Sequence, residues 1–340
     1  MKSYISAAIV FSILLLTVPA APLVMGKFSS AEAKHILSES SQQTEPTSGT
    51  SEKNSDLLKY ETLKVLDITT GRVEEISAFD YVVGAVCAEM PATFEPEALK
   101  AQAVAAYTYA VRQAIKAETS PSPELCGAYF SNDTLKYQAY FTENQARQYY
   151  GENYDEYIKK IKAAVSEVKY EYMVYEDEPI IAAFHSVSTG KTESAENVWD
   201  SDIAYLVSVD SQYDTKSPKF TEVYEFTDSE MKHLLEAAFD EIKLSENASD
   251  WFSDEVLSES GNVISITVGD KKASGQEIRS ALSLRSAAFD ITYNEGFEIT
   301  TKGCGHCVGM SQYGANEMAK TGAEYSEILK HYYTGVEIKN

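Results

Sequence analysis

Two neighbouring alanine-rich stretches, separated by a pair of prolines, constrain the fold of this chain more than any other feature. The first stretch, Ala78 to Met90, is apolar on most of its faces, which predicts a helix buried on nearly all sides. Pro91 and Pro96 interrupt it, because proline cannot continue a helix from its interior. The alanine spacing that follows predicts a second helix, from Pro96 to about Ala117, whose small side chains allow close packing. The fold must therefore enclose a two-helix element.

The rest of the chain mixes strand and helix patterns without an internal repeat, which predicts an α+β fold with one large mixed domain over residues 59–340. Strand patterns favour a hairpin over Leu63–Ile76, a pair of strands over Tyr170–His185 joined near Asp177, and a strand over Val263–Val268. Helical patterns occur over Asp228–Leu244, Gly275–Leu284 and Ser326–Tyr333, the last of which is expected to close the chain.

The first 58 residues differ in composition from the remainder. Residues 1–26 hold one long uncharged apolar run, Tyr4 to Met25, which is long enough to span a bilayer. The small pair Ala20-Ala21 is followed at once by Pro22, a poor context for cleavage, so an uncleaved membrane anchor is favoured over a cleaved signal. Residues 27–58 are polar and rich in Ser, Thr and Glu, which predicts a disordered linker. We expect a single N-terminal membrane pass and an extracytoplasmic domain.

The charge balance limits the classes of partner. The chain carries 52 acidic and 29 basic residues, a net charge of −23, and shows no basic stripe. A strongly acidic surface repels phosphate, so nucleic acid is excluded as the main partner. Docking on an anionic membrane surface is disfavoured for the same reason, whereas a neutral glycan is compatible with this balance.

Glu89 is the first candidate for chemistry. It ends the predicted buried helix within Val86-Cys87-Ala88-Glu89-Met90-Pro91, among apolar neighbours. Burial penalises the ionised form of a carboxyl group and raises its pKa, as a general acid near neutral pH requires. The alternative is a helix-end glutamate that points into solvent, as most glutamates do.

A glycine-rich stretch near the carboxyl terminus is the second candidate. Residues 305–315 place His306, Ser311, Gln312 and Tyr313 among glycines, which allow the backbone to approach a ligand closely. These side chains offer the hydrogen bonds that a sugar needs. The spacing of the glycines does not match a serine nucleophile elbow. The alternative is a tight turn packed beneath the active site, with His306 in a structural role.

The four cysteines leave three alternatives open. Cys304 and Cys307 flank His306 in a partial metal-ligand pattern, to which Cys87 could add a further ligand. A disulfide or buried free thiols would fit the same residues. We expect Cys87 to approach the other two from the side of the helix opposite Glu89, because two residues of helix turn a side chain by about 200°. Cys126 has no obvious partner.

Two elements of the sequence resemble those of the stage II sporulation protein D family of peptidoglycan lytic transglycosylases. The first is Ala88-Glu89-Met90-Pro91 followed by EALKAQAVAA over residues 97–106, and the second is GHCVGMSQYGA over residues 305–315. The resemblance covers about residues 60 to 338. The chain departs from the family pattern at Tyr107, where an arginine is usual, and at Cys307, where a glycine is usual.

The resemblance implies a function and a set of site residues. Glu89 would be the acid/base that cleaves peptidoglycan strands during endospore engulfment, with formation of 1,6-anhydro-muramyl ends and without metal or cofactor. A membrane-bound sporulation amidase and a membrane partner are the implied associates, and a non-catalytic amidase enhancer that binds the wall is the alternative. The implied substrate-binding residues, expected to share one cleft with Glu89, are Ser188, Tyr205, Asp214, His306, Ser311, Gln312 and Tyr313.

Overall fold

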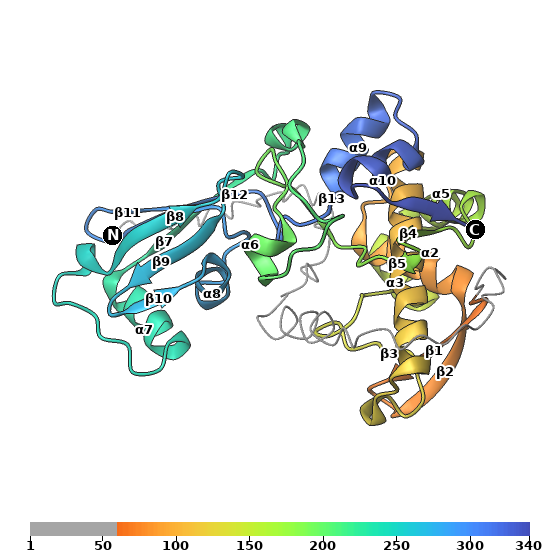
Figure 1. Cartoon of the computed structure of the whole chain (residues 1–340), viewed down its shortest axis with the longest axis horizontal. Coiled ribbons are helices and arrows are strands. Elements are labelled where there is room, and N and C mark those ends of the chain that lie inside the picture. The colour runs from red at the N-terminus through yellow and green to blue at the C-terminus, as the bar shows by residue number, and fades with distance from the viewer. Residues whose placement is uncertain (1–59) are drawn as a thin grey trace, which may run out of the picture.

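The computed structural model describes residues 60–340 and shows a mixed fold of helices and small sheets (Figure 1). The α+β class is confirmed. The predicted anchor, residues 1–26, and linker, residues 27–58, lie outside the described residues. No helix within the described part of the chain combines the length and the apolar character that a membrane crossing requires.

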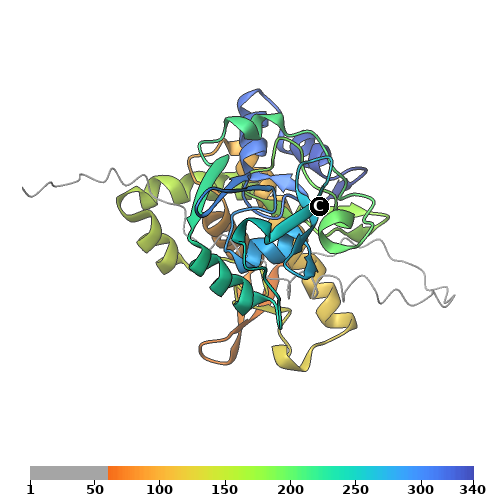
Figure 2. The same cartoon turned by 90° about the vertical axis from the view of Figure 1, so that its left-hand side faces the viewer.

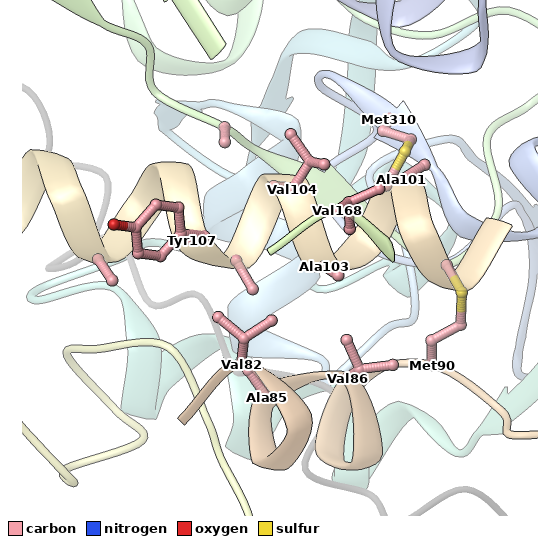
Figure 3. Packing of buried hydrophobic residues seen from close by; sticks show 14 of the residues in the cluster. Val82, Ala85, Val86, Met90, Ala101, Ala103, Val104, Tyr107, Val168 and Met310 are labelled. Carbon is pink, nitrogen blue, oxygen red and sulfur yellow. The ribbon is translucent and has the colours of Figure 1, made fainter. Parts of the chain in front are cut away.

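The predicted two-helix element forms the centre of the larger hydrophobic core. Helix α2, Ala78–Glu89, begins at Ser77, whose side chain accepts a hydrogen bond from the Asp80 N–H. Helix α3, Pro96–Thr119, begins with its proline in the first turn, as predicted. Figure 3 shows side chains of the two helices facing each other across the core. Ala101, Ala105 and Ala110 on α3 are fully buried, because their small side chains let neighbouring elements approach.

Helices and short sheets surround this pair. Helices α5, Tyr154–Glu167, α9, Gln312–Lys320, and α10, Tyr325–Tyr332, pack against α3. The predicted hairpin is confirmed as β1, Thr62–Asp67, and β2, Arg72–Ser77, joined in register from Thr62↔Ser77 to Asp67↔Arg72. The shorter elements of this region are β3, Phe130–Ser131, α4, Glu143–Tyr150, and the 3-10 turns Pro123–Leu125 and Gly151–Asn153.

The predicted strand pair at residues 170–185 is present, and a further strand at the carboxyl terminus pairs with it. Strand β4, Tyr172–Tyr175, pairs with the short β5, Glu178–Pro179, through a turn at Glu176 and Asp177. Strand β14, Glu337–Lys339, adds to the other edge of β4. The expectation that a helix closes the chain is therefore wrong, because the residues after α10 pair with β4.

A second hydrophobic core lies beside the first (Figure 1), and its elements face the viewer in Figure 2. It is enclosed by two three-stranded sheets in the orders β11-β12-β7 and β10-β9-β8, together with two helices. These elements are β7, Thr221–Phe226, α7, Asp228–Ala238, the 3-10 turn Ala248–Asp250, β8, Phe252–Leu257, β9, Val263–Val268, β10, Lys271–Ala273, α8, Gly275–Ala281, β11, Phe289–Tyr293, and β12, Phe297–Lys302.

The helix predicted over residues 228–244 ends six residues early, at Ala238. Phe239 adopts an extended conformation, and the Lys243 N–H donates to the Asp270 carboxylate. Phe239, Ile242 and Leu244 still pack on the second core. Their apolar spacing therefore reflected burial in an irregular segment rather than helix.

The segment between the two cores holds the glycine-rich motif in place. Strand β6, Phe184–His185, pairs in parallel with β13, Met310–Ser311, which leads directly into α9. After β6 the chain forms α6, Ala195–Trp199, and the 3-10 helix Gln212–Lys216 before it enters the second core.

The start of the described chain lies against both α3 and the first residue of α2, because the Tyr60 N–H donates to the Tyr107 hydroxyl and the Ala78 N–H donates to the Glu61 carbonyl. The Tyr60 hydroxyl donates to Glu118, one residue before the end of the 24-residue helix. The loop that follows Glu89 leads into the other end of the same helix. The start of the described chain therefore lies against α3 between its middle, at Tyr107, and its carboxyl-terminal end.

Candidate active site

Glu89 is the last residue of α2, directly before the proline-containing loop. Its side chain keeps partial contact with solvent, but protein atoms crowd its carboxyl group. Burial raises the pKa of Glu89 to about 8, opposed by a hydrogen bond from the backbone of Ala139. The carboxyl group is therefore largely protonated at neutral pH, which is the state from which a general acid acts.

The two distant motifs meet at the end of α2. The Gln312 side-chain Nε2 donates to the Glu89 backbone carbonyl at 3.0 Å and to Gln102 Oε1 on α3 at 3.2 Å. Asn316, one turn further along α9, accepts from the Glu95 N–H at 2.8 Å. Gln312, Gln102 and Asn316 are all buried. Helix α9 therefore fixes both ends of the loop that carries Glu89 into α3.

Aromatic side chains lie in this loop and on the elements next to it. The half-buried Phe94, in the loop, and Tyr313, next to Gln312, form an edge-on pair with ring centroids 6.5 Å apart. Tyr81 on α2 is fully buried, and the proximity of Glu89 contributes to the raised pKa of its hydroxyl. Tyr81 packs against the half-buried Tyr140, which follows Ala139, with centroids 5.3 Å apart. Phe94, Tyr313 and Tyr140 are thus partly exposed aromatic residues on the segments that adjoin Glu89.

The segment over residues 138–141 completes the surroundings of Glu89. The Gln138 side chain accepts from the Tyr81 hydroxyl at 3.0 Å, and the Phe141 N–H donates to the Gly84 carbonyl at 3.0 Å. A Cβ atom on Gly84 would lie 2.3 Å from the Phe141 carbonyl oxygen, so only glycine permits this approach. Sequence reasoning missed the segment, and the one available signal was Gly84 in an otherwise strong helix pattern.

Three of the predicted substrate-binding residues form one buried network. Asp214 accepts from the Ser188 N–H and from the Ser311 hydroxyl, both at 2.8 Å. All three side chains are fully buried, and burial raises the pKa of Asp214 while these hydrogen bonds lower it. Ser311 is also the N-cap of α9, where it accepts from the Gly314 N–H. The network holds the start of the helix that carries Gln312 and does not reach the surface.

Replacing Asp214 by alanine is expected to cost about 3 kcal/mol of folding stability, because the buried Ser188 N–H and Ser311 hydroxyl would lose their acceptor. Urea unfolding of the variant measures this cost, and Asp202→Ala, at an exposed position, is the matched control. Any activity is expected to fall only in proportion to the folded fraction. A stable variant that no longer bound glycan would instead make Asp214 a substrate contact.

The other predicted site residues lie in different surroundings. Tyr205 is half-buried, accepts from the Ile181 N–H, and lies near Arg112 on α3. Arg112 follows Gln102, the partner of Gln312, by ten residues, so these two positions on α3 are about 15 Å apart along the helix axis. His306 is buried against Trp199, with ring centroids 5.5 Å apart, and burial holds its pKa well below the usual range. The substrate-binding roles of Tyr205 and His306 stay predictions.

The glycines of the carboxyl-terminal motif are required by close contacts. Gly309 has φ of +71°, and a Cβ atom there would lie 2.1 Å from the Ala183 carbonyl oxygen. A Cβ atom on Gly314 would lie 2.1 Å from the Tyr332 hydroxyl. The motif therefore packs β13 and the start of α9 tightly against β6 and α10, which sets the position of Gln312.

The expected approach of Cys87 to Cys304 and Cys307 is wrong, and of the three alternatives the structure shows buried thiols. Cys87 lies at the Tyr150 side of α2, whereas Cys307 contacts backbone oxygens of Val187 and Gly305. None of the four cysteines is in a disulfide, and within residues 60–340 no three His, Cys, Asp or Glu side chains are grouped to hold a metal ion. Cys87 does turn away from Glu89 as its helical position requires, but α4 and α5 cover that face. Cys87, Cys304 and Cys307 are buried thiols.

Tyr107, which stands where the family usually has arginine, does not face Glu89. Its ring packs against Tyr170 and Tyr172, and its hydroxyl accepts from the Tyr60 N–H at 3.1 Å. This departure therefore lies in the middle of α3, where Tyr107 contacts Tyr60, Tyr170 and Tyr172.

Comparisons with known proteins place the chain in a family. A family model described as stage II sporulation protein matches residues 67–175, which include Glu89 and α3. The stage II sporulation protein D of Bacillus subtilis (strain 168) is 35% identical over 342 residues, covering 99% of this chain and 96% of that protein. That of Bacillus amyloliquefaciens is 42% identical over 268 residues, covering 78% of this chain and 75% of that protein.

A more distant relative carries a different name. The amidase enhancer of Bacillus subtilis (strain 168) is 28% identical over 306 residues, which cover 75% of this chain and 40% of that protein. The matches as a whole define a protein of sporulation. The chain belongs to the stage II sporulation protein D family.

Proposed function

We propose that the chain is a lytic transglycosylase that cleaves peptidoglycan glycan strands during endospore engulfment, with Glu89 as acid and then base. One observation carries this proposal: burial raises the pKa of Glu89 to about 8 at a position fixed by both motifs. A protonated carboxyl group with partial access to solvent is suited to donate a proton to a glycosidic oxygen.

The proposed reaction needs one carboxyl group and no water. Glu89 protonates the oxygen that leaves C1 of the muramyl sugar, and the C1–O bond breaks. The hydroxyl oxygen on C6 of the same sugar then attacks C1, and Glu89, now a carboxylate, takes its proton. The products are a 1,6-anhydro end and a new free hydroxyl end, and Glu89 is protonated again. A hydrolytic glycosidase commonly uses two carboxyl groups instead.

The surroundings of Glu89 support a glycan as the substrate. Phe94 lies in the loop that follows Glu89, Tyr313 packs against it, and Tyr140 follows the Ala139 backbone that hydrogen-bonds the carboxyl group. All three rings are partly exposed, and sugar rings pack on such surfaces. We assign these three residues to strand binding. Ser188, Asp214 and Ser311 are instead assigned to positioning α9, because their polar atoms are engaged with one another in the interior.

The proposal includes a place of action and associated proteins. An N-terminal membrane pass would hold the domain outside the cytoplasm, close to the wall. A membrane-bound sporulation amidase would first remove stem peptides from the strands, and a membrane partner would hold the two enzymes together. These associations rest on the family resemblance.

The second candidate function is a wall-binding amidase enhancer without catalysis of its own. The likeness to a protein with that name favours it. The two functions differ in their requirement for Glu89, since an enhancer needs no protonated carboxyl group at the end of α2. We favour the transglycosylase because the raised pKa of Glu89 has no evident use in binding alone.

Mass spectrometry of reaction products tests the proposal. The purified full chain is incubated with wall glycan strands, with and without prior removal of their stem peptides. We expect fragments with anhydro ends, each lighter by one water than a hydrolysis product, and no uptake of oxygen from ¹⁸O-labelled water. Intact strands, together with faster cleavage by an added amidase, would support the enhancer instead. Fragments labelled with ¹⁸O would show hydrolysis and contradict the proposed mechanism.

A further inference from the structure

The peptide group that follows Glu89 is held at both of its polar atoms. The carbonyl oxygen of Glu89 accepts from Gln312 Nε2 at 3.0 Å. The N–H of the same peptide group, on Met90, donates to the Val86 carbonyl at 3.0 Å. The last carbonyl groups of a helix have no partner within the helix, so Gln312 supplies one that α2 lacks. The plane of this peptide group is thereby fixed, and with it the backbone from which the Glu89 side chain projects.

The amide group of Gln312 is in turn oriented by Gln102 on α3. Gln312 Nε2 carries two protons, and it donates to the Glu89 carbonyl and to Gln102 Oε1, the latter at 3.2 Å. Turning the Gln312 amide over would place its oxygen against these two acceptors. Only the observed orientation therefore holds Glu89. Both amide protons of Gln312 are used within the protein, which leaves this group none to donate to a sugar.

Gln102 carries an unpaired donor in the interior. Its side chain is fully buried in the alanine-rich part of α3. Its Oε1 is turned toward Gln312, and no acceptor within residues 60–340 pairs with its Nε2. A buried donor without a partner lowers stability, whereas a methionine of similar length would fill the space without that cost. Packing alone therefore favours an apolar residue here, and a local departure from the rules of packing is typical of a functional site.

We propose that Gln102 and Gln312 form a positioning pair, which holds the Glu89 carboxyl group in place through the Glu89 backbone and makes no contact with the substrate. The inference deepens the proposed function, on which it rests for the reaction. Gln102 belongs to the first of the two sequence motifs and Gln312 to the second, so the pair joins them in one task. A shift of about 1 Å in a reacting group can cost about 10²-fold in rate. The pair therefore acts on kcat and leaves substrate affinity unchanged.

Kinetics of methionine variants test the pair. The double variant Gln102→Met/Gln312→Met removes both amides at similar volume, and removal of both partners of a buried hydrogen bond changes stability little. We expect its urea midpoint to stay close to that of the wild type. Its kcat for the release of anhydro ends is expected to fall about 10- to 100-fold, while KM changes by less than about twofold.

A single variant and a control accompany the double variant. Gln102→Met alone also removes the unpaired donor, so we expect it to keep the wild-type urea midpoint and to lower kcat about threefold. The matched control is Gln148→Met on the exposed face of α4, for which no change in midpoint, kcat or KM is expected.

A second measurement needs no activity. Burial raises the pKa of Glu89 to about 8, so Glu89→Gln is expected to gain stability relative to its parent between pH 5 and pH 9. Without Gln312, the end of α2 is free to move and gives the carboxyl group more contact with water. We therefore expect a smaller gain when Glu89→Gln is introduced into the double variant. An equal gain in both parents would overturn the pair.

The outcomes separate the positioning pair from the proposed function. Anhydro products formed by the double variant at the wild-type kcat would overturn the pair and leave the transglycosylase intact. A raised KM at unchanged kcat would make Gln312 a substrate contact, and activity that fell only with the folded fraction would make the pair merely structural. Either result overturns the inference. Absence of anhydro products from the wild type would contradict the transglycosylase, and the unfolding measurement would then decide whether the pair holds the carboxyl group.

Discussion

Replacing Glu89 by glutamine is expected to abolish the formation of anhydro products while the protein stays folded. Glutamine keeps the shape of the side chain but has no proton to give to the leaving oxygen and cannot take one from the C6 hydroxyl. General acid–base catalysis contributes about 10²- to 10⁴-fold to a rate, and here one residue serves in both steps. We therefore expect a loss of at least about 10³-fold, measured as anhydro ends released per unit time.

The matched control for this variant is Glu95→Gln. Glu95 lies six residues further along, in the same loop, and its recorded hydrogen bond to Asn316 uses its backbone N–H rather than its carboxyl group. Activity of the control is expected to stay within a factor of about two, since surface substitutions perturb a structure little. Near-normal activity of Glu89→Gln, with normal folding, would show that another group is the acid/base.

The same substitution is expected to stabilise the protein at alkaline pH. The pKa of Glu89 is about 8 in the folded chain against an ordinary value of 4.5, so the folded state retains a proton that the unfolded state releases. Below pH 4.5 both states are protonated and the carboxyl group carries no penalty. As the pH rises from 4.5 to about 8, the free energy of unfolding of the wild type falls by about 2 to 5 kcal/mol. The range extends to the lower value because the side chain keeps partial contact with solvent.

Unfolding free energies at pH 5 and pH 9 measure this effect. Because glutamine does not ionise, the stability of Glu89→Gln relative to wild type is expected to increase between the two pH values. Glu95→Gln is expected to follow the wild type at both. If the difference in unfolding free energy between wild type and Glu89→Gln were the same at pH 5 and pH 9, folding would not raise the pKa of the Glu89 carboxyl group. A variant that is more stable and inactive shows that the wild-type side chain lowers stability and is needed for activity.

The elements that were predictable from sequence are those set by local chemistry. Ser77, Pro91 and Pro96 fix the ends of α2 and α3 through hydrogen bonds and backbone geometry within a few residues. The apolar character of α2 likewise required burial. The approach of Gln312 to Glu89 could be predicted only through the family resemblance, since no local pattern joins residues so far apart.

The features that local patterns do not specify depend on contact between distant segments. Asp214 sits in a hydroxyl-rich region that suggests sugar binding, yet long-range packing buries it against Ser188 and Ser311. Cys87 and Cys307 share a residue type, but α4 covers the former and the segment near Val187 covers the latter. The division of the interior into two cores also depends on which strands pair, and alternation along a single strand does not specify its neighbour.

The placement of Tyr60 and Glu89 along α3 has a consequence for any attachment through the preceding chain. The Tyr60 N–H donates to the Tyr107 hydroxyl in the middle of the helix. The Gln138 N–H, next to the Ala139 backbone that hydrogen-bonds Glu89, donates to the Tyr109 hydroxyl two residues further along. One helix therefore ties the start of the described chain to the surroundings of Glu89, so a force applied at the former would move both as a single body.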